Sequence, residues 1–251
     1  MFDSQLLQET IESQPYPLMF MTISGAHLYG FASPDSDWDL RGVHVVPTGR
    51  VLGLYPVTET IEVNETEADC ELDLVTHEVK KFLGLLLKNN GYVLEQLYSP
   101  LIIKTTPEHQ QLKAIARGCI TRNHYHHYAG FAKNQWQLFT KGDTHYVKPL
   151  LYIYRVLLTG IYLMQTGTIE ANLIDLNREF QLSYLKDLIA QKQTEAEKTV
   201  LTDLNLEFHY QEYQKLQEQL KLASDRTSLP DTPSSKPELN SFLIQLRASK
   251  K

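Results

Sequence analysis

The sequence predicts an α/β (α+β) protein in which a mixed sheet with helices precedes an all-helical part. Two observations support this fold class. Apolar runs of strand length, and stretches that alternate polar with β-branched residues, occur only in roughly the first hundred residues. After Pro107, apolar residues recur at helical spacing instead. We therefore expect an α/β domain over residues 1–106 and a helical domain over residues 107–251.

The first part carries candidate strands rich in β-branched and other apolar residues. They are residues 18–23, 42–46, 58–63 and 71–76. A helix follows, because Val79, Phe82 and Leu86 recur at three- and four-residue steps. Residues 89–91 are expected to end it in the manner of a C-cap. A shorter helix that Asp3 caps is expected before the first strand.

The second part is expected to consist of helices separated by loops. Residues 150–165 are apolar on most sides, which predicts a buried central helix with Pro149 in its first turn and Gly167 after its end. Arg155 interrupts this helix and therefore needs a partner. The other expected segments are helical spacing over 108–141, two helices within 169–222, a loop over 224–237 and a short helix over 238–247.

The composition is that of a soluble globular protein, with 42% hydrophobic and 22% charged residues. The net charge of −6 gives no basic excess, so strong binding to duplex DNA is not expected. The N-terminus lacks the features of a signal peptide, and the apolar stretch 150–164 is too short to span a bilayer. Cys70 and Cys119 are far apart, which does not indicate a disulfide framework. We expect a cytoplasmic protein that does not associate with membranes.

Asp37 and Asp39 are the residues most indicative of chemistry. Alternate residues of an extended strand point the same way, so both carboxylates are expected to project from one face. Two like charges this close repel each other unless a cation lies between them. Trp38 and Leu40 indicate a strand whose other face is buried, and a rigid carboxylate pair suits Mg²⁺. The alternative is a turn, since residues 33–36 are rich in turn-forming types.

Asp73 is the candidate for a third carboxylate. Leu72 and Leu74 flank it in a predicted buried strand, where an unpaired carboxylate would cost on the order of several kcal/mol. Three carboxylates can hold two metal ions about 3.5–4 Å apart for in-line phosphoryl transfer. The alternative is a carboxylate at the strand edge that pairs with a lysine. Upstream, Gly25 would let the backbone approach a ligand, and a helix beginning there would offer free N–H groups to a phosphate.

The order of these residues resembles the DNA-polymerase-β-like nucleotidyltransferase superfamily, which has a glycine, an Asp-x-Asp pair and a third aspartate on a later strand. Two strings, residues 25–30 and 36–43, resemble more narrowly the RNA-ligase-associated predicted nucleotidyltransferases (RlaP type). Further similarity lies at residues 81–83, 86–90, 127–133, 148–155 and 228–230. The resemblance therefore covers most of the chain, with gaps at residues 1–16, 47–70 and 168–220.

The resemblance implies a polymerase-β-like nucleotidyltransferase fold in which a helical domain closes over the nucleotide. It implies a metal-dependent enzyme that transfers a nucleoside monophosphate from a nucleoside triphosphate such as ATP to a hydroxyl of RNA, a protein or a small molecule. Asp37, Asp39 and Asp73 would be the catalytic and metal-binding residues, with two Mg²⁺ or Mn²⁺ ions. The residues expected at the nucleotide are Gly25, Ala26, Ser36, Arg41, Lys133, Lys148 and Arg155.

Alternatives to this enzyme stay open. The superfamily usually has Gly-Ser or Gly-Gly after the first strand, whereas this chain has Gly25-Ala26, which lacks a hydroxyl donor but keeps the backbone N–H donors. One alternative is therefore a catalytically weak or inactive nucleotide-binding or regulatory module on the same fold. Another is an antitoxin-like protein that nucleotidylates a partner. Arg41 alternatively has a structural role and pairs with the aspartates, and Lys133 and Lys148 alternatively lie on solvated helix surfaces.

Overall fold

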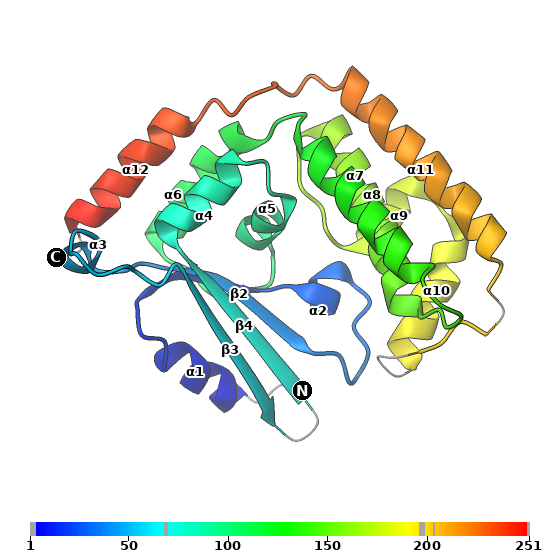
Figure 1. Cartoon of the computed structure of the whole chain (residues 1–251), viewed down its shortest axis with the longest axis horizontal. Helices are drawn as coiled ribbons and strands as arrows, with labels where there is room; N and C mark the ends of the chain where they lie inside the picture. Colours follow the sequence, from blue (N-terminus) through cyan, green and yellow to red (C-terminus); the bar gives the residue numbers. More distant parts are fainter. Residues whose placement is uncertain (1–3, 68–69, 196–198, 203, 250–251) are drawn as a thin grey trace.

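The structure is a computed structural model that describes residues 4–67, 70–195, 199–202 and 204–249 (Figure 1). Five strands form one mixed sheet in the order β3-β4-β2-β1-β5. The strands are β1 (Leu18–Ile23), β2 (Trp38–His44), β3 (Thr60–Glu67), β4 (Cys70–Glu78) and β5 (Ile102–Lys104). Helices make up most of the chain after β5, so the predicted fold class is confirmed.

The helices of the first part are α1 (Ser4–Glu12), α2 (Gly25–Tyr29), α3 (Thr48–Val51), α4 (Val79–Leu87) and α5 (Gly91–Tyr98). Those of the second part are α6 (Pro107–Ala116), α7 (His124–Phe139), α8 (Val147–Thr166), α9 (Leu173–Phe180), α10 (Ser183–Thr194), α11 (Leu206–Arg226) and α12 (Lys236–Ser249), with a 3₁₀ turn, η1 (Arg117–Cys119), after α6. The predicted cap Asp3 lies outside the described residues.

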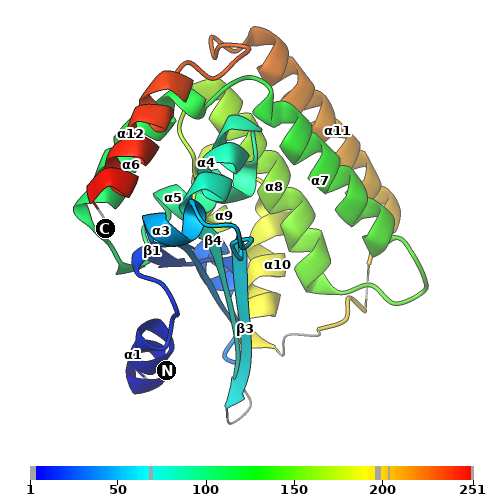
Figure 2. The same ribbon diagram turned by 60° about the vertical axis from the view of Figure 1, so that its left-hand side comes forward.

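The central strands β2 and β4 are parallel, and every other pairing in the sheet is antiparallel. The register of β2 on β4 places Asp39 directly beside Asp73. Because side chains alternate across a strand, these two aspartates lie on one face of the sheet, and Leu40 and Leu74 lie on the other. The leucine face packs with α1, and the aspartate face turns toward α4 and α5 (Figures 1 and 2).

The first strand has the predicted bounds, whereas β2 begins at Trp38, four residues before the predicted start at Gly42. The strand therefore includes Asp39, as expected from its neighbours Trp38 and Leu40, but not Asp37, which was expected on the same strand face. The edge strand β5 was not predicted, because three residues are too few to show a period of two. It is held by its pairing with β1, which only the folded chain provides.

Residues 89–91 connect the end of α4 to the start of α5. Asn89 has a positive φ of 56°, as a residue after a helix end often does. Asn90 begins the next helix, because its side chain accepts a hydrogen bond from the N–H of Tyr92 at 3.0 Å. This connection is short, so α5 lies beside α4 over the sheet and closes one side of the site described below.

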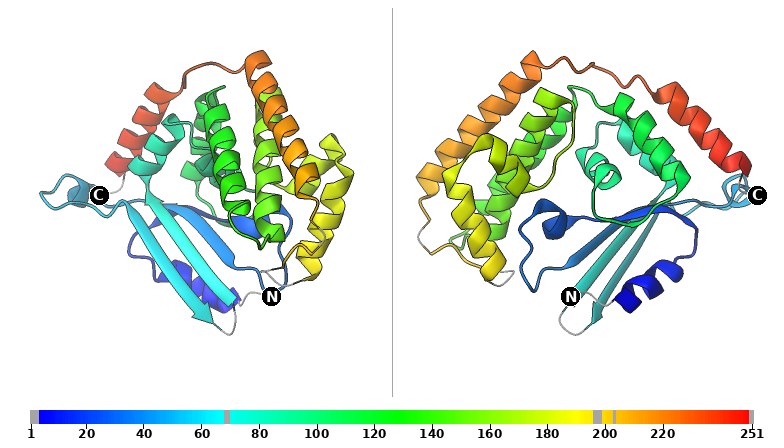
Figure 3. Two further views of the ribbon diagram at one scale, coloured as in Figure 1. Left: turned by 45° about the vertical axis from the view of Figure 1, so that its right-hand side comes forward. Right: turned by 180° about the vertical axis from the view of Figure 1, so that it is seen from behind.

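The predicted central helix is α8, which lies between α7 and α11 and is buried along most of its length (Figure 3). One hydrophobic core runs from Phe20 on β1 through Leu150 on α8 to Phe242 on α12. The terminal helix α12 packs on α4 and α6 (Figure 2). The division at residues 106 and 107 stays a prediction.

The helix α8 is longer than the apolar stretch 150–164, which was expected to be too short for a membrane span. The helix has 20 residues and is long and apolar enough to cross a bilayer, because it extends beyond the apolar stretch 150–164 at both ends. However, 78% of its apolar window is buried inside the protein. Such burial is typical of the core helix of a soluble protein.

A buried histidine at the start of α7 is expected to make stability depend on pH. Burial lowers the pKa of the fully buried His124 to about 4, and its Nδ1 accepts a hydrogen bond from the N–H of Thr121 at 3.2 Å. The ordinary pKa of 6.5 applies in the unfolded chain, so the unfolded state binds more protons between pH 6.5 and pH 4. The contribution of His124 to stability is therefore fully present above pH 6.5. As the pH falls toward 4, this contribution is lost, by about 3 kcal/mol.

Chemical unfolding at a series of pH values, compared between the wild type and His124→Asn, would measure this contribution. Asparagine can still accept from Thr121 but does not titrate, so the variant should lose less stability between pH 6.5 and pH 4. His126, exposed on the same helix, offers the control variant His126→Asn, which should keep the wild-type pH dependence. Equal slopes for the wild type and His124→Asn would contradict the expectation.

Candidate functional site

Two carboxylates lie side by side where β2 and β4 begin. Asp39 and Asp73 are register partners, and their side chains are 25% and 40% exposed. They project from the same face of the sheet, next to α2. The acidic pair on neighbouring strands is thus Asp39 with Asp73, whereas Asp37 of the Asp-x-Asp pattern precedes β2.

Arg41 lies between these carboxylates. Its Nη2 donates to Asp39 Oδ1 at 2.6 Å and to Asp73 Oδ2 at 2.7 Å. Its Nη1 donates to the main-chain oxygens of Leu40 and Asp73 at 2.9 and 2.6 Å. The guanidinium therefore neutralises part of the acidic pair and holds it in one geometry. The structure thus gives Arg41 the pairing role that was the alternative to nucleotide binding.

Gly25 fixes the position of the Asp39 carboxylate. This first residue of α2 has a φ of +59°, a conformation that favours glycine. A Cβ at this position would lie 1.8 Å from Asp39 Oδ2, so the main chain and the carboxylate are in direct contact. The predicted close approach of the backbone at Gly25 is therefore made to Asp39 itself.

Burial raises the pKa of Asp39 above its ordinary value. The charge of Arg41 opposes this shift, Asp73 adds to it, and Lys148 opposes it. The predicted cation Lys148, in the first turn of α8, is therefore close enough to act on Asp39. Burial outweighs these cations, so the net effect of the surroundings is to disfavour the charged form of Asp39.

Asp37 lies one residue before β2 and is half-buried. The loop leading to it, residues 30–36, is held by Ser33 and Ser36, whose hydroxyls are 3.0 Å apart. The fully buried Lys192 of α10 donates to Ser33 Oγ at 2.6 Å and lies 3.5 Å from Ser36 Oγ. The predicted phosphate contact Ser36 is thus turned into the loop, where it positions the chain before Asp37.

A cavity of about 390 Å³ opens beside the acidic pair. Gly25, Asp39 and Arg41 form one wall of it. The other walls combine aromatic rings with amide side chains. These residues are Tyr29, Tyr92, Tyr152, Asn90 and Gln96. His77 also lines the cavity, and burial lowers its pKa to about 4, so its imidazole is neutral at pH 7. Aromatic walls with a few polar groups are typical of sites for small organic ligands.

The predicted cations of the helical part have different positions. Lys148 lies near Asp39, as its electrostatic effect shows. Lys133 is exposed on α7 and does not line the cavity. Arg155 is buried, and its Nη1 donates to Glu95 Oε1 of α5 at 2.7 Å, so the structure does not present it to a phosphate. Ala26 is buried in the hydrophobic core.

The three predicted metal ligands are not gathered into a ready-made cluster. Among the described residues, no group of three or more His, Cys, Asp or Glu side chains has the arrangement of a metal site. Asp39 and Asp73 each direct an oxygen to Arg41 instead. Carboxylate oxygens such as those of Asp37 and Asp39 are of the hard type that divalent cations prefer.

Lys192, Tyr29 and Tyr92 were not predicted from the sequence as residues of the site. Lys192 carried a signal, because it follows Leu185, Leu188 and Ile189 at helical spacing on the buried side of α10. A lysine at such a position needs a polar partner. The cavity tyrosines Tyr29, Tyr92 and Tyr152 come from three different helices, so only the fold brings them together.

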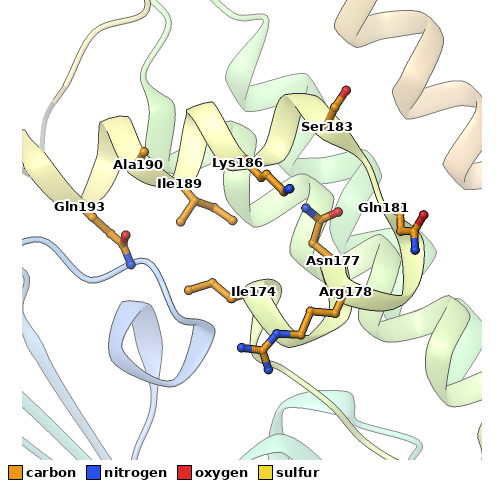
Figure 4. A pocket seen from close by; sticks show the side chains of 9 residues that line it. All are labelled: Ile174, Asn177, Arg178, Gln181, Ser183, Lys186, Ile189, Ala190 and Gln193. Carbon is orange, nitrogen blue, oxygen red and sulfur yellow. The ribbon is translucent and has the colours of Figure 1, made fainter.

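A larger cavity, of about 700 Å³, lies between α9 and α10 (Figure 4). Three of its polar side chains have partners within the protein. Arg178 pairs with Asp175, Asn177 donates to the main chain of Leu182 at 3.1 Å, and Gln193 donates to the main chain of Gly30 at 3.0 Å. The cavity lacks the acidic side chains of the site at Asp39. It is therefore the weaker candidate.

Comparisons with known proteins agree with the resemblance inferred from the sequence. The family model described as RNA repair pathway DNA polymerase beta family matches residues 3–245. The chain is 34% identical over 182 residues to the uncharacterized protein MJ0002 of Methanocaldococcus jannaschii, an alignment that covers 70% of this chain and 74% of that protein. It is 25% identical over 198 residues to the uncharacterized protein YcgL of Bacillus subtilis, with coverages of 78% and 72%.

Among solved structures, a nucleotidyltransferase-like protein from Exiguobacterium sibiricum aligns with 98% of this chain and 79% of its own, with a TM-score of 0.34 and 12% identity. The family match extends over nearly the whole chain, so the resemblance to the RlaP type is confirmed.

Proposed function

The chain belongs to the RNA repair pathway DNA polymerase beta family, and on that premise we propose that it transfers a nucleoside monophosphate from a nucleoside triphosphate to a hydroxyl acceptor. The observation that carries this proposal is the acidic pair Asp39 and Asp73, which lies on one face of the sheet and of which Asp39 lines a cavity with aromatic walls. The acceptor is a hydroxyl of RNA, a protein or a small molecule.

The triphosphate would lie between Gly25 and Lys148. Asp37 and Asp39 would hold a divalent cation, Mg²⁺ or Mn²⁺, which offsets the negative charge of the phosphates during transfer. Lys148 adds a positive charge on the same side, since it already acts on Asp39. Two repelling carboxylates at a phosphate site are stable only with cations of this kind around them.

The nucleoside would occupy the neighbouring cavity. A base can stack on the rings of Tyr92 or Tyr152, and Asn90 and Gln96 can donate to or accept from its edge. The acceptor hydroxyl would approach Asp73, which is 40% exposed and whose carboxylate can accept its proton. Arg41 keeps that carboxylate in place through its contact with Oδ2.

Asp39→Asn is expected to abolish transfer and to weaken nucleotide binding by at least about tenfold, which corresponds to about 1.4 kcal/mol. The amide keeps the shape of the side chain but loses the charge that holds a cation. The assay would combine labelled nucleoside triphosphates, Mg²⁺ or Mn²⁺ and a lysate containing RNA and protein acceptors. Asp225→Asn, on the exposed surface of α11, is the matched control and should behave as the wild type. Equal transfer by Asp39→Asn would refute the assigned role.

A nucleotide-binding module without turnover is the second candidate. Ala26 favours it, because this buried methyl group occupies the position where the superfamily usually has a serine or glycine. The backbone N–H groups remain available, so binding would survive the loss of a hydroxyl donor. Calorimetry that shows metal-dependent triphosphate binding, together with an assay that finds no product with any acceptor, would select this candidate over the transferase.

A further inference from the structure

We infer that Arg41 takes the place of the second divalent cation of a two-metal site, so that each chain binds a single divalent cation with its nucleotide. This inference rests on the proposed function, because it concerns how the same site binds a triphosphate. It also departs from the two ions that the family resemblance implies. Its basis is the position of one guanidinium group between two carboxylates.

Arg41 engages one oxygen of each carboxylate that a second ion would share. An ion shared by β2 and β4 would take one oxygen from Asp39 and one from Asp73. Arg41 Nη2 already bonds Asp39 Oδ1 at 2.6 Å and Asp73 Oδ2 at 2.7 Å. A guanidinium and a divalent cation repel each other at this separation, so the two cannot share these oxygens.

Arg41 is also anchored independently of the carboxylates. Its Nη1 donates to the main-chain oxygens of Leu40 and Asp73, which belong to the two central strands. The side chain is 18% exposed and forms part of the cavity wall. An ion that displaced it would leave these donors without their acceptors, which opposes displacement.

The contact with Asp73 gives Arg41 a second role. Because the guanidinium is fixed on Asp73, it also orients the carboxylate that faces the acceptor hydroxyl. Arg41 is therefore a positioning residue.

The test counts metal ions per bound nucleotide. Equilibrium dialysis of the full chain with Mn²⁺ and a non-hydrolysable triphosphate, followed by assay of both, should give one Mn²⁺ per bound triphosphate for the wild type. Arg41→Met, similar in length but uncharged, should give two. Arg178→Met, an exposed arginine of α9 that pairs with Asp175, is the control and should stay at one.

Two ions per triphosphate in the wild type would overturn the inference while leaving the proposed function intact. A ratio of one in Arg41→Met would overturn it as well, provided that this variant unfolds cooperatively. If Arg41→Met does not fold, Arg41→Gln is the second variant, with the same expected gain of one ion. No bound triphosphate in the wild type would overturn the proposed function itself, and the inference with it.

Discussion

Arg155→Met is expected to lower the free energy of unfolding by about 3–5 kcal/mol, the range found when one partner of a buried ion pair is removed. Arg155 and Glu95 each have side chains that are 1% exposed, and their charged atoms are 2.7 Å apart. Methionine fills much of the same volume, but it leaves the Glu95 carboxylate buried with its contact to Tyr29 at 3.2 Å. Chemical denaturation of the two proteins would measure the difference.

A second replacement separates the lost charge from the lost packing. The double variant Glu95→Gln, Arg155→Met removes both charges, so it should be more stable than Arg155→Met alone. Arg178→Met breaks an exposed pair with Asp175 and should change stability by no more than about 1 kcal/mol. If Arg155→Met unfolded within that same limit, the ion pair would not have the structural role assigned here.

This ion pair also contacts a tyrosine of the cavity wall, Tyr29. The Arg155 guanidinium lies 3.9 Å from the centroid of the Tyr29 ring, and Tyr29 and Tyr152 both line the cavity at Asp39. The pair joins α5 over the sheet to α8 of the helical part. Arg155 thus supports the cavity wall, whereas the family resemblance had suggested a contact with phosphate.

Local sequence patterns predict the features that depend on near neighbours, but not the contacts between residues far apart in sequence. The alternation around Asp39 and the apolar flanks of Asp73 were enough to place both on strands, since these features depend on near neighbours. The need of Arg155 for a partner was also visible, because it interrupts an apolar helix. Its partner Glu95 was not, because the two are 60 residues apart and no local periodicity connects them.

The same limit applies to Arg41 and Lys192. Arg41 was recognised as a possible partner of the aspartates from its position on their strand. That it bridges both follows only from the parallel register of β2 and β4. Lys192 lies 159 residues from Ser33, so the contact that holds the loop before Asp37 depends on how α10 packs in the finished fold. Site residues supplied by long-range contacts need the structure.

Gly25→Ala is expected to weaken nucleotide binding while leaving the fold intact. Its φ of +59° is costly for alanine, on the order of 1–3 kcal/mol. The new Cβ would also lie 1.8 Å from Asp39 Oδ2, so the carboxylate must rotate away from the position that faces the triphosphate. The added methyl group thus changes the site directly, and the resulting loss of affinity should be at least about tenfold.

Gly84→Ala is the matched control, because a Cβ at this helical glycine of α4 would meet nothing within 4 Å. It should bind nucleotide as the wild type does and gain about 0.5–1 kcal/mol of stability, since glycine weakens a helix interior relative to alanine. Calorimetric titration of a triphosphate with Mg²⁺ into both variants, beside their thermal unfolding, separates a local effect at Asp39 from a general loss of structure. Gly25→Ala that folds and binds with unchanged affinity would show that the contact between Gly25 and Asp39 does not set the geometry of the site.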